Sequence, residues 1–222
     1  MPLLIPSAPP GVMTAFTDGL PMFLSGPNYG LGGNLVASGY IRSAPVIPSL
    51  PDVSTAAGPD VHDPQEVFVL NLTAAGTFGA PVSTYWRVFA GTRQFSTVMG
   101  RVTQRPPTNP WKMTSAYYGD PVAGRDRVWA ACQILDDIRL LPEVRAEDYN
   151  LRVLKVPMLN LESFWLVHTV AGLSDLVVPF PAAPNQSIPA LNTAFVYSMG
   201  GFLSRILPLA KRLLITPPYS GA

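Results

Sequence analysis

Side chains that could carry out chemistry are few and widely spaced in this chain of 222 residues. His62 stands between Asp60 and Asp63, a combination that could ligate a hard or borderline metal ion. A catalytic metal centre needs a further ligand from elsewhere, and His168 is the only other histidine. We therefore expect a solvated turn at His62, in which Asp63 precedes a proline and caps its own backbone. No metal and no cofactor are expected.

Cys132 is the only cysteine, so no intrachain disulfide can form and nothing indicates an oxidising compartment. Together with His62 or His168, its thiol could form a nucleophile and base pair. Cys132 falls, however, on the apolar face of a helix predicted below, where a free thiol behaves as a small hydrophobic group. We expect it to be inert, and no catalytic residue is predicted.

Two further patterns are weak signals of chemistry. The pairs Asp136, Asp137 and Glu147, Asp148 could supply a hydrolase with an acid and a base. Neighbouring helix residues point about 100° apart, so the first pair does not converge on one substrate, and salt bridges to nearby arginines are expected instead. The sequence Gly30-Leu31-Gly32-Gly33-Asn34 resembles a phosphate-binding loop, but no strand precedes it and no long helical pattern follows.

Composition gives a stronger indication than any motif. Only 13% of the residues are charged, 48% are hydrophobic and 25 are proline, whereas an ordinary soluble domain has about 25% charged residues. The formal net charge of +1 creates no field that would attract nucleic acid. A surface with so little charge predicts that much of it is covered by a protein partner.

Residues 1–64 form a distinct segment with eleven prolines and five charged residues. Because proline removes an amide donor and biases its predecessor towards extended geometry, we expect an extended or looped arm. The arm carries apolar residues, which predicts that it lies on its own body or on a neighbouring subunit. Its first residues lack a basic region and a continuous apolar run, so we expect no signal peptide and a protein that is cytoplasmic or incorporated in a particle.

Residues 65–189 have the pattern of strands bounded by turn residues. Strands are predicted at 66–72, 83–90 and 94–102 as one antiparallel meander, and at 151–158, 161–169 and 175–180 as a second. A proline-rich loop is predicted at 104–119. An amphipathic helix is predicted from Asp120 to about Leu141, because apolar residues recur there at spacings of three and four.

Residues 190–215 predict a C-terminal helix with one apolar stripe, which Pro208 should kink or restart. The predicted fold is α+β and strand-dominated, with antiparallel sheet segments around one central amphipathic helix, an extended arm and a C-terminal helix. The predicted divisions are an arm at 1–64, a body at 65–189, and a helix and tail at 190–222.

The leading hypothesis is a non-enzymatic structural subunit of a larger assembly, with a virion or phage-like particle component favoured. Extended arms cross subunit boundaries in shell, tail and cement proteins, and surfaces occupied by neighbours need little charge. The expected partners are protein, either copies of this chain or other subunits, and neither nucleic acid nor membrane is favoured. The expected contact residues are Leu4, Ile5, Phe16, Phe23, Trp111, Tyr117, Tyr118, Phe195, Phe202 and Ile206.

Two alternatives make different predictions. An α+β enzyme or small-molecule-binding protein would have an enclosed pocket near His168, between the central helix and the strand at 161–169. A peripheral membrane subunit would dock through residues 190–215 and would expose Phe195, Phe202 and Ile206.

Overall fold

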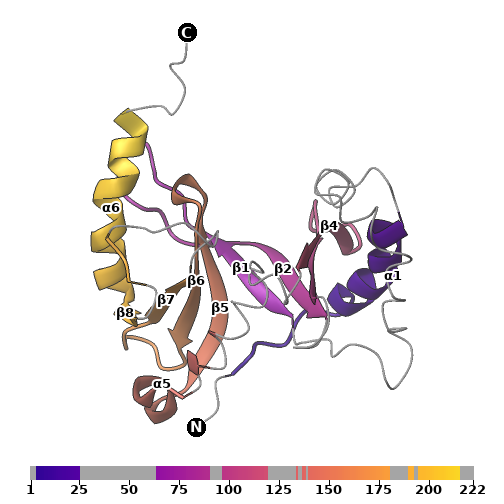
Figure 1. Ribbon diagram of the computed structural model, residues 1–222, viewed down its shortest axis with the longest axis horizontal. Coiled ribbons are helices and arrows are strands. Elements are labelled where there is room, and N and C mark those ends of the chain that lie inside the picture. The colour runs from indigo at the N-terminus through magenta and orange to yellow at the C-terminus, as the bar shows by residue number, and fades with distance from the viewer. Residues whose placement is uncertain are drawn as a thin grey trace. The chain divides into compact units, whose positions relative to one another are not determined.

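The computed structural model describes residues 4–25, 64–90, 97–119, 134, 137–138, 140–180, 190–192 and 195–215 (Figure 1). Side chains of residues 21–25, 89–90, 97–98, 117–119 and 215 are not described. The fold is mixed α+β and strand-dominated, as predicted. Its strands are β1 (Gln65–Val69), β2 (Val82–Ala90), β3 (Thr97–Thr103), β4 (Lys112–Gly119), β5 (Tyr149–Val156), β6 (Leu161–His168), β7 (Leu176–Phe180) and β8 (Tyr197–Ser198). They form one sheet in the order β4-β3-β2-β1-β5-β6-β7-β8.

The helices of the described residues are α1 (Val12–Ser25), α5 (Pro142–Ala146) and α6 (Met199–Ile215), with a 3-10 turn η2 at Pro157–Leu159. The chain divides into two compact units. Unit 1 comprises Met1–Pro6, Glu66–Thr84 and Ala131–Ala222, and unit 2 comprises Ser7–Gln65 and Tyr85–Ala130. Each unit has its own buried cluster of apolar side chains.

In unit 2, helix α1 packs on the antiparallel meander β2-β3-β4. Val12, Phe16 and Leu20 recur every four residues, so they form one stripe along α1, and all three are fully buried. The strand side chains in the same cluster are Trp86, Val88, Val102, Met113 and Ala116. This stripe makes α1 the hydrophobic cover of one face of the meander.

Two glycines allow this close approach. A β-carbon added at Gly100 of β3 would lie 2.5 Å from ring atoms of Phe16, and one added at Gly19 of α1 would lie 2.5 Å from Cβ of Met113. Carbon atoms ordinarily approach to about 3.5–4.0 Å. Only glycine therefore leaves room for the ring of Phe16 on β3 and for the backbone of α1 on β4.

The prediction that residues 1–64 are extended or looped is wrong for 12–25. The ten residues from Gly11 to Leu20 contain no proline, which is enough for more than two helical turns carrying the apolar stripe. Pro21 lies inside the helix, although proline there removes a hydrogen bond and crowds the preceding turn. Burial of the stripe stabilises the helix more than the overall proline content of the segment disfavours it.

Unit 1 contains the second predicted meander, which is confirmed. Strands β5, β6 and β7 pair antiparallel in sequence, and the short β8 adds to β7. The three strands of the first predicted meander are neighbours in the sheet, in the order β3-β2-β1, and β2 and β3 pair antiparallel as predicted. The prediction did not include the parallel pairing of β1 with β5 or the addition of β4 to β3. Strand β4 lies in the predicted loop 104–119, since the prolines of that segment end at Pro110 and leave residues 112–119 free to form a strand.

Helix α6 covers one face of the unit 1 sheet (Figure 1). It begins at Met199 rather than at 190, and it continues through Pro208 instead of restarting there. Phe202, Ile206 and Ala210 are fully buried in its inner stripe. Pro208 is exposed, so the carbonyl that loses its amide partner faces water.

The predicted central helix is not confirmed. Of residues 120–141, only 134, 137, 138, 140 and 141 are described, and Ile134, Asp137 and Ile138 are helical. The separate helix α5 follows, with Pro142 at its first turn, where the missing amide is tolerated.

Candidate functional site

His168, the residue at the centre of the pocket hypothesis, is the last residue of β6 and is buried. Its Nδ1 accepts a hydrogen bond of 2.9 Å from the backbone N–H of Val170. A neutral imidazole that accepts at Nδ1 carries its proton on Nε2. Nε2 lies 3.7 Å from Oε2 of Glu147, too far for a hydrogen bond, and it has no hydrogen-bond partner among the described residues.

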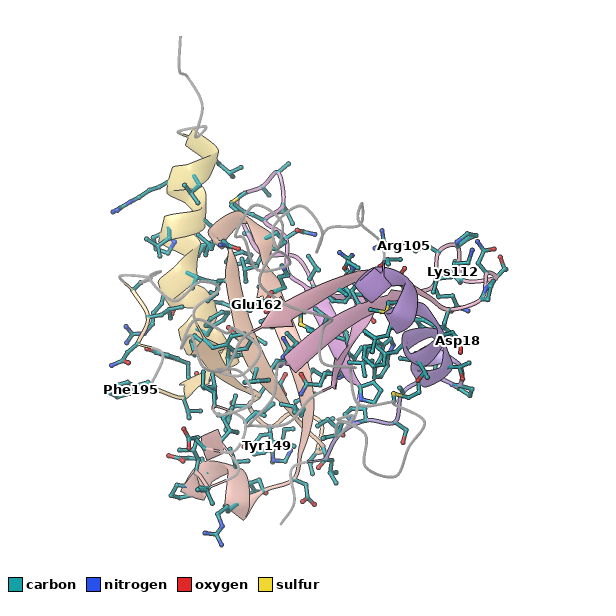
Figure 2. The ribbon with its side chains drawn as sticks, turned by 45° about the vertical axis from the view of Figure 1, so that its right-hand side comes forward. Asp18, Arg105, Lys112, Tyr149, Glu162 and Phe195 are labelled. Carbon is teal, nitrogen blue, oxygen red and sulfur yellow. The ribbon has the colours of Figure 1, made fainter. Side chains whose placement is uncertain are left out.

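Tyr149, at the start of β5, lies directly opposite His168 in the strand register. The two rings meet edge to face with centroids 5.0 Å apart. Burial raises the pKa of the Tyr149 hydroxyl, and the negative charges of Glu147, Asp175 and Glu143 raise this pKa further. Tyr149, labelled in Figure 2, therefore keeps its proton to a higher pH than an ordinary tyrosine.

Asp175 joins this cluster to the opposite face of the sheet. Its Oδ1 accepts a hydrogen bond of 2.9 Å from the backbone N–H of His168, and its Oδ2 accepts one of 2.9 Å from Nε1 of Trp165. Its backbone carbonyl accepts from the N–H of Met199, the first residue of α6. The carboxylate thus ties the end of β6 to the loop before β7, and the same residue anchors the start of α6.

The chemical capacity of this cluster is small. It holds a proton donor and an imidazole, but neither a serine nor a cysteine among the described residues lies in hydrogen-bond contact with His168. The side chain of His168 is only 3% exposed, so a substrate has little access to it. Within the described ranges, no three His, Cys, Asp or Glu residues are grouped as a metal site. Cys132, His62 and the loop at 30–34 lie outside the described residues.

A second polar cluster lies on the α6 face of the unit 1 sheet. The guanidinium of Arg152 lies 4.7 Å from the ring centre of Phe68 and 5.7 Å from that of Trp165. Its Nε is 3.8 Å from Oε2 of Glu66, whose Oε1 accepts a hydrogen bond of 2.6 Å from Ser83. Cation–π stacking and a nearby carboxylate therefore hold Arg152 flat on the sheet.

The structure divides the expected contact residues into three groups. Phe16, Phe202 and Ile206 are fully buried in the two cores of the chain, so they offer no surface to a partner. Ile5 and Trp111 are half-buried, while Leu4 and Phe195 are exposed, Phe195 by 58% (Figure 2). The side chains of Phe23, Tyr117 and Tyr118 lie outside the described residues.

The structure does not fit the surface that the membrane hypothesis predicts. That hypothesis requires Phe202 and Ile206 to be exposed, and both are buried on the inner side of α6. Among the described helices, none has the length and apolar character needed to cross a membrane.

Sequence reasoning missed several exposed apolar side chains. Those in unit 1 with more than half of their surface exposed are Val82, Leu140, Val170, Leu173 and Leu214. Val170 and Leu173 lie in the loop between β6 and β7. An apolar residue within a turn, where polar residues are usual, is the signal that could have identified them.

The comparisons with known proteins add no assignment. No family model, no curated protein and no solved structure matches this chain.

Proposed function

We propose that this protein is a non-enzymatic structural subunit of a larger protein assembly, with a virion or phage-like particle as the favoured setting. The observation that carries the proposal is the pairing of the N-terminal segment with β5. The N–H of Leu4 donates to the carbonyl of Tyr149 at 2.8 Å, and the N–H of Leu151 donates to the carbonyl of Leu4 at 2.7 Å. Leu4 thereby adds to β5 in parallel, opposite Asn150.

This attachment relies on the backbone rather than on side-chain burial. The side chain of Leu4 remains 40% exposed, and Pro2 and Pro6 limit the length of strand that can pair. Every copy of the chain offers the same amide and carbonyl groups on β5, so the segment of one copy fits β5 of another equally well. Exchange of such an element between identical chains is a low-cost route to assembly.

Two further observations support an assembly role. Phe195, Val170 and Leu173 are more than half exposed, and large apolar side chains of this kind are typical of surfaces that bind other proteins. The whole chain has only 29 charged residues, which leaves little charge to keep such surfaces apart in solution. By contrast, the near-complete burial of His168 weakens the alternative of a small-molecule pocket at that residue.

The test is the mass of the chain in solution, measured by light scattering after gel filtration. Leu4→Pro removes the N–H that binds the carbonyl of Tyr149, whereas the matched control Leu4→Ala keeps the backbone donor. We expect the parent and Leu4→Ala to form particles of several chains, and Leu4→Pro to shift towards the monomer. Equal masses for all three proteins would overturn the proposal.

A deletion of the N-terminal residues provides a second test, but it must be short. Removing residues 1–64 would also remove α1, and with it the buried Val12, Phe16 and Leu20 of the unit 2 core. A deletion of residues 1–6 removes the pairing segment and leaves α1 intact. It should reproduce the effect of Leu4→Pro while the circular dichroism spectrum stays that of the folded protein.

A further inference from the structure

We infer that unit 2 carries a binding site for a phosphate-like oxyanion on the face of its meander opposite α1. The site is built on three residues that lie side by side on adjacent strands: Arg87 of β2, Arg101 of β3 and Ser115 of β4, here called the arginine row. Arg87 is the Cα partner of Arg101, and Arg101 is the Cα partner of Ser115.

Strand alternation places the arginine row on this face. Trp86, Val88 and Val102 belong to the cluster under α1, and successive side chains of a strand point to opposite faces. Arg87 and Arg101 therefore point away from α1. A register irregularity next to Arg101 interrupts the β3-β4 ladder, beyond which Val102 pairs with Met113, and such bulges redirect side chains near functional sites.

Among the described residues, Arg101 has no ion-pair partner. Its guanidinium lies 4.1 Å from the centre of the Tyr85 ring, which fixes one flat side of the group and leaves its edge for hydrogen bonds. Its Nε is buried and has no hydrogen-bond partner among the described residues, and the same holds for Oγ of Ser115. Two neighbouring polar groups in the row are thus buried with donors to spare.

The residue opposite Arg101 in the row is also an arginine. Arg87 is only 2% exposed and its Nε donates to Oε1 of Gln65 at 2.8 Å, so a second cation lies directly across from Arg101. Like charges in directly opposite positions destabilise a strand pair.

The donors of the site select the class of ligand. The guanidinium edge of Arg101 can bind two oxygens of one oxyanion, and the hydroxyl of Ser115 supplies a further donor. These features suit a phosphate group better than a halide, which cannot accept such a planar pair of hydrogen bonds. The inference does not depend on the assembly proposed above.

The test measures binding of inorganic phosphate to the full chain by calorimetry, with chloride keeping the ionic strength constant. Arg101→Gln should weaken phosphate binding about tenfold or more, since hydrogen bonds to charged groups are the strong ones and each tenfold step is about 1.4 kcal/mol. Arg101→Lys keeps the charge but loses the two-pronged edge, so it should fall between the parent and Arg101→Gln. Ser115→Ala should weaken binding severalfold.

Arg105→Gln is the matched control, because it removes the same charge from an exposed residue of the loop after β3, outside the row. It should leave phosphate affinity unchanged. Absence of phosphate binding by the parent would overturn the inference. So would equal losses in Arg101→Gln and Arg105→Gln, which would mean only general electrostatic attraction. If Arg101→Gln fails to fold, as judged by circular dichroism, Arg101→Lys and Ser115→Ala decide the question.

Discussion

Replacing Gly100 with alanine tests whether residues of the N-terminal arm belong to the core. The new β-carbon would lie 2.5 Å from Cδ2 and Cε2 of Phe16 and 3.0 Å from Cε of Met113. The ring of Phe16 would have to retreat by about 1 Å to restore an ordinary contact. Because Phe16 is fully buried between Val12 and Leu20, this movement has to displace α1 as well.

The size of the effect follows from two opposing terms. Overpacking of a well-filled core costs about 1–3 kcal/mol, while replacing glycine by alanine in a strand returns roughly 0.5–1 kcal/mol. With the middle value of each range, the net loss of unfolding free energy is about 1–1.5 kcal/mol. For a chain of this size, such a loss lowers the melting temperature by roughly 2–8 °C.

The assay is thermal and urea denaturation of four proteins: the parent, Gly100→Ala, Phe16→Leu and the double variant. Removing the ring should relieve the clash, so the double variant should be more stable than the sum of the single effects by at least about 0.5 kcal/mol. Gly200→Ala is the control, since nothing lies within 4 Å of its added β-carbon. Strictly additive losses would refute the packing of α1 on β3, as would a Gly100→Ala protein with unchanged stability.

Two further predictions concern the cluster at the end of β6. Burial and nearby carboxylates raise the pKa of Tyr149 above 10.0, so this residue ionises at a lower pH in the unfolded chain than in the folded protein. The stability that it contributes is full below about pH 10 and is lost as the pH rises towards the folded-state pKa. Between pH 9 and pH 11, urea denaturation should therefore show a smaller loss of unfolding free energy for Tyr149→Phe than for the parent, and equal losses would contradict the raised pKa. Asp175→Asn replaces one acceptor by a donor that faces either Trp165 Nε1 or the His168 amide, and it should lower the unfolding free energy by about 1.5–3 kcal/mol. The exposed Asp137→Asn should change it by less than about 0.5 kcal/mol, and a similar value for both variants would show that Asp175 does not act as the link.

The local sequence pattern was sufficient for most strands and for the antiparallel pairing of consecutive strands, but not for the pairing of β1 with β5. β2, β5, β6 and β7 lie within two residues of their predicted limits at either end, because runs of β-branched and aromatic residues there are bounded by turn residues. The parallel pairing of β1 with β5 joins segments about 85 residues apart, and no local pattern specifies such a partner. Strand β4 falls inside the predicted loop 104–119, whose prolines all precede residue 112.

The N-terminal segment shows a different limit. Proline content averaged over 64 residues concealed the ten residues from Gly11 to Leu20, in which Val12, Phe16 and Leu20 repeat at helical spacing. The same averaging made Phe16 a candidate for contact with a partner, although its ring fills the core of unit 2. For the polar clusters, His168 could be singled out from sequence, but Tyr149 and Asp175 could not, because only strand register and a loop bring them to it.

The central claim is that the segment around Leu4 pairs with β5 of another copy. The most direct test uses two proteins in a Cys132→Ser background, one carrying Leu4→Cys and the other Asn150→Cys, since these positions are bridge partners. Each chain then has a single cysteine, and any disulfide between Cys at 4 and Cys at 150 must join two molecules. We predict a product of twice the chain mass when the two proteins are mixed under mild oxidation. We predict none of this product when either protein is oxidised alone. The account would be contradicted if mixing yields no such product while a chain carrying both cysteines closes its disulfide internally.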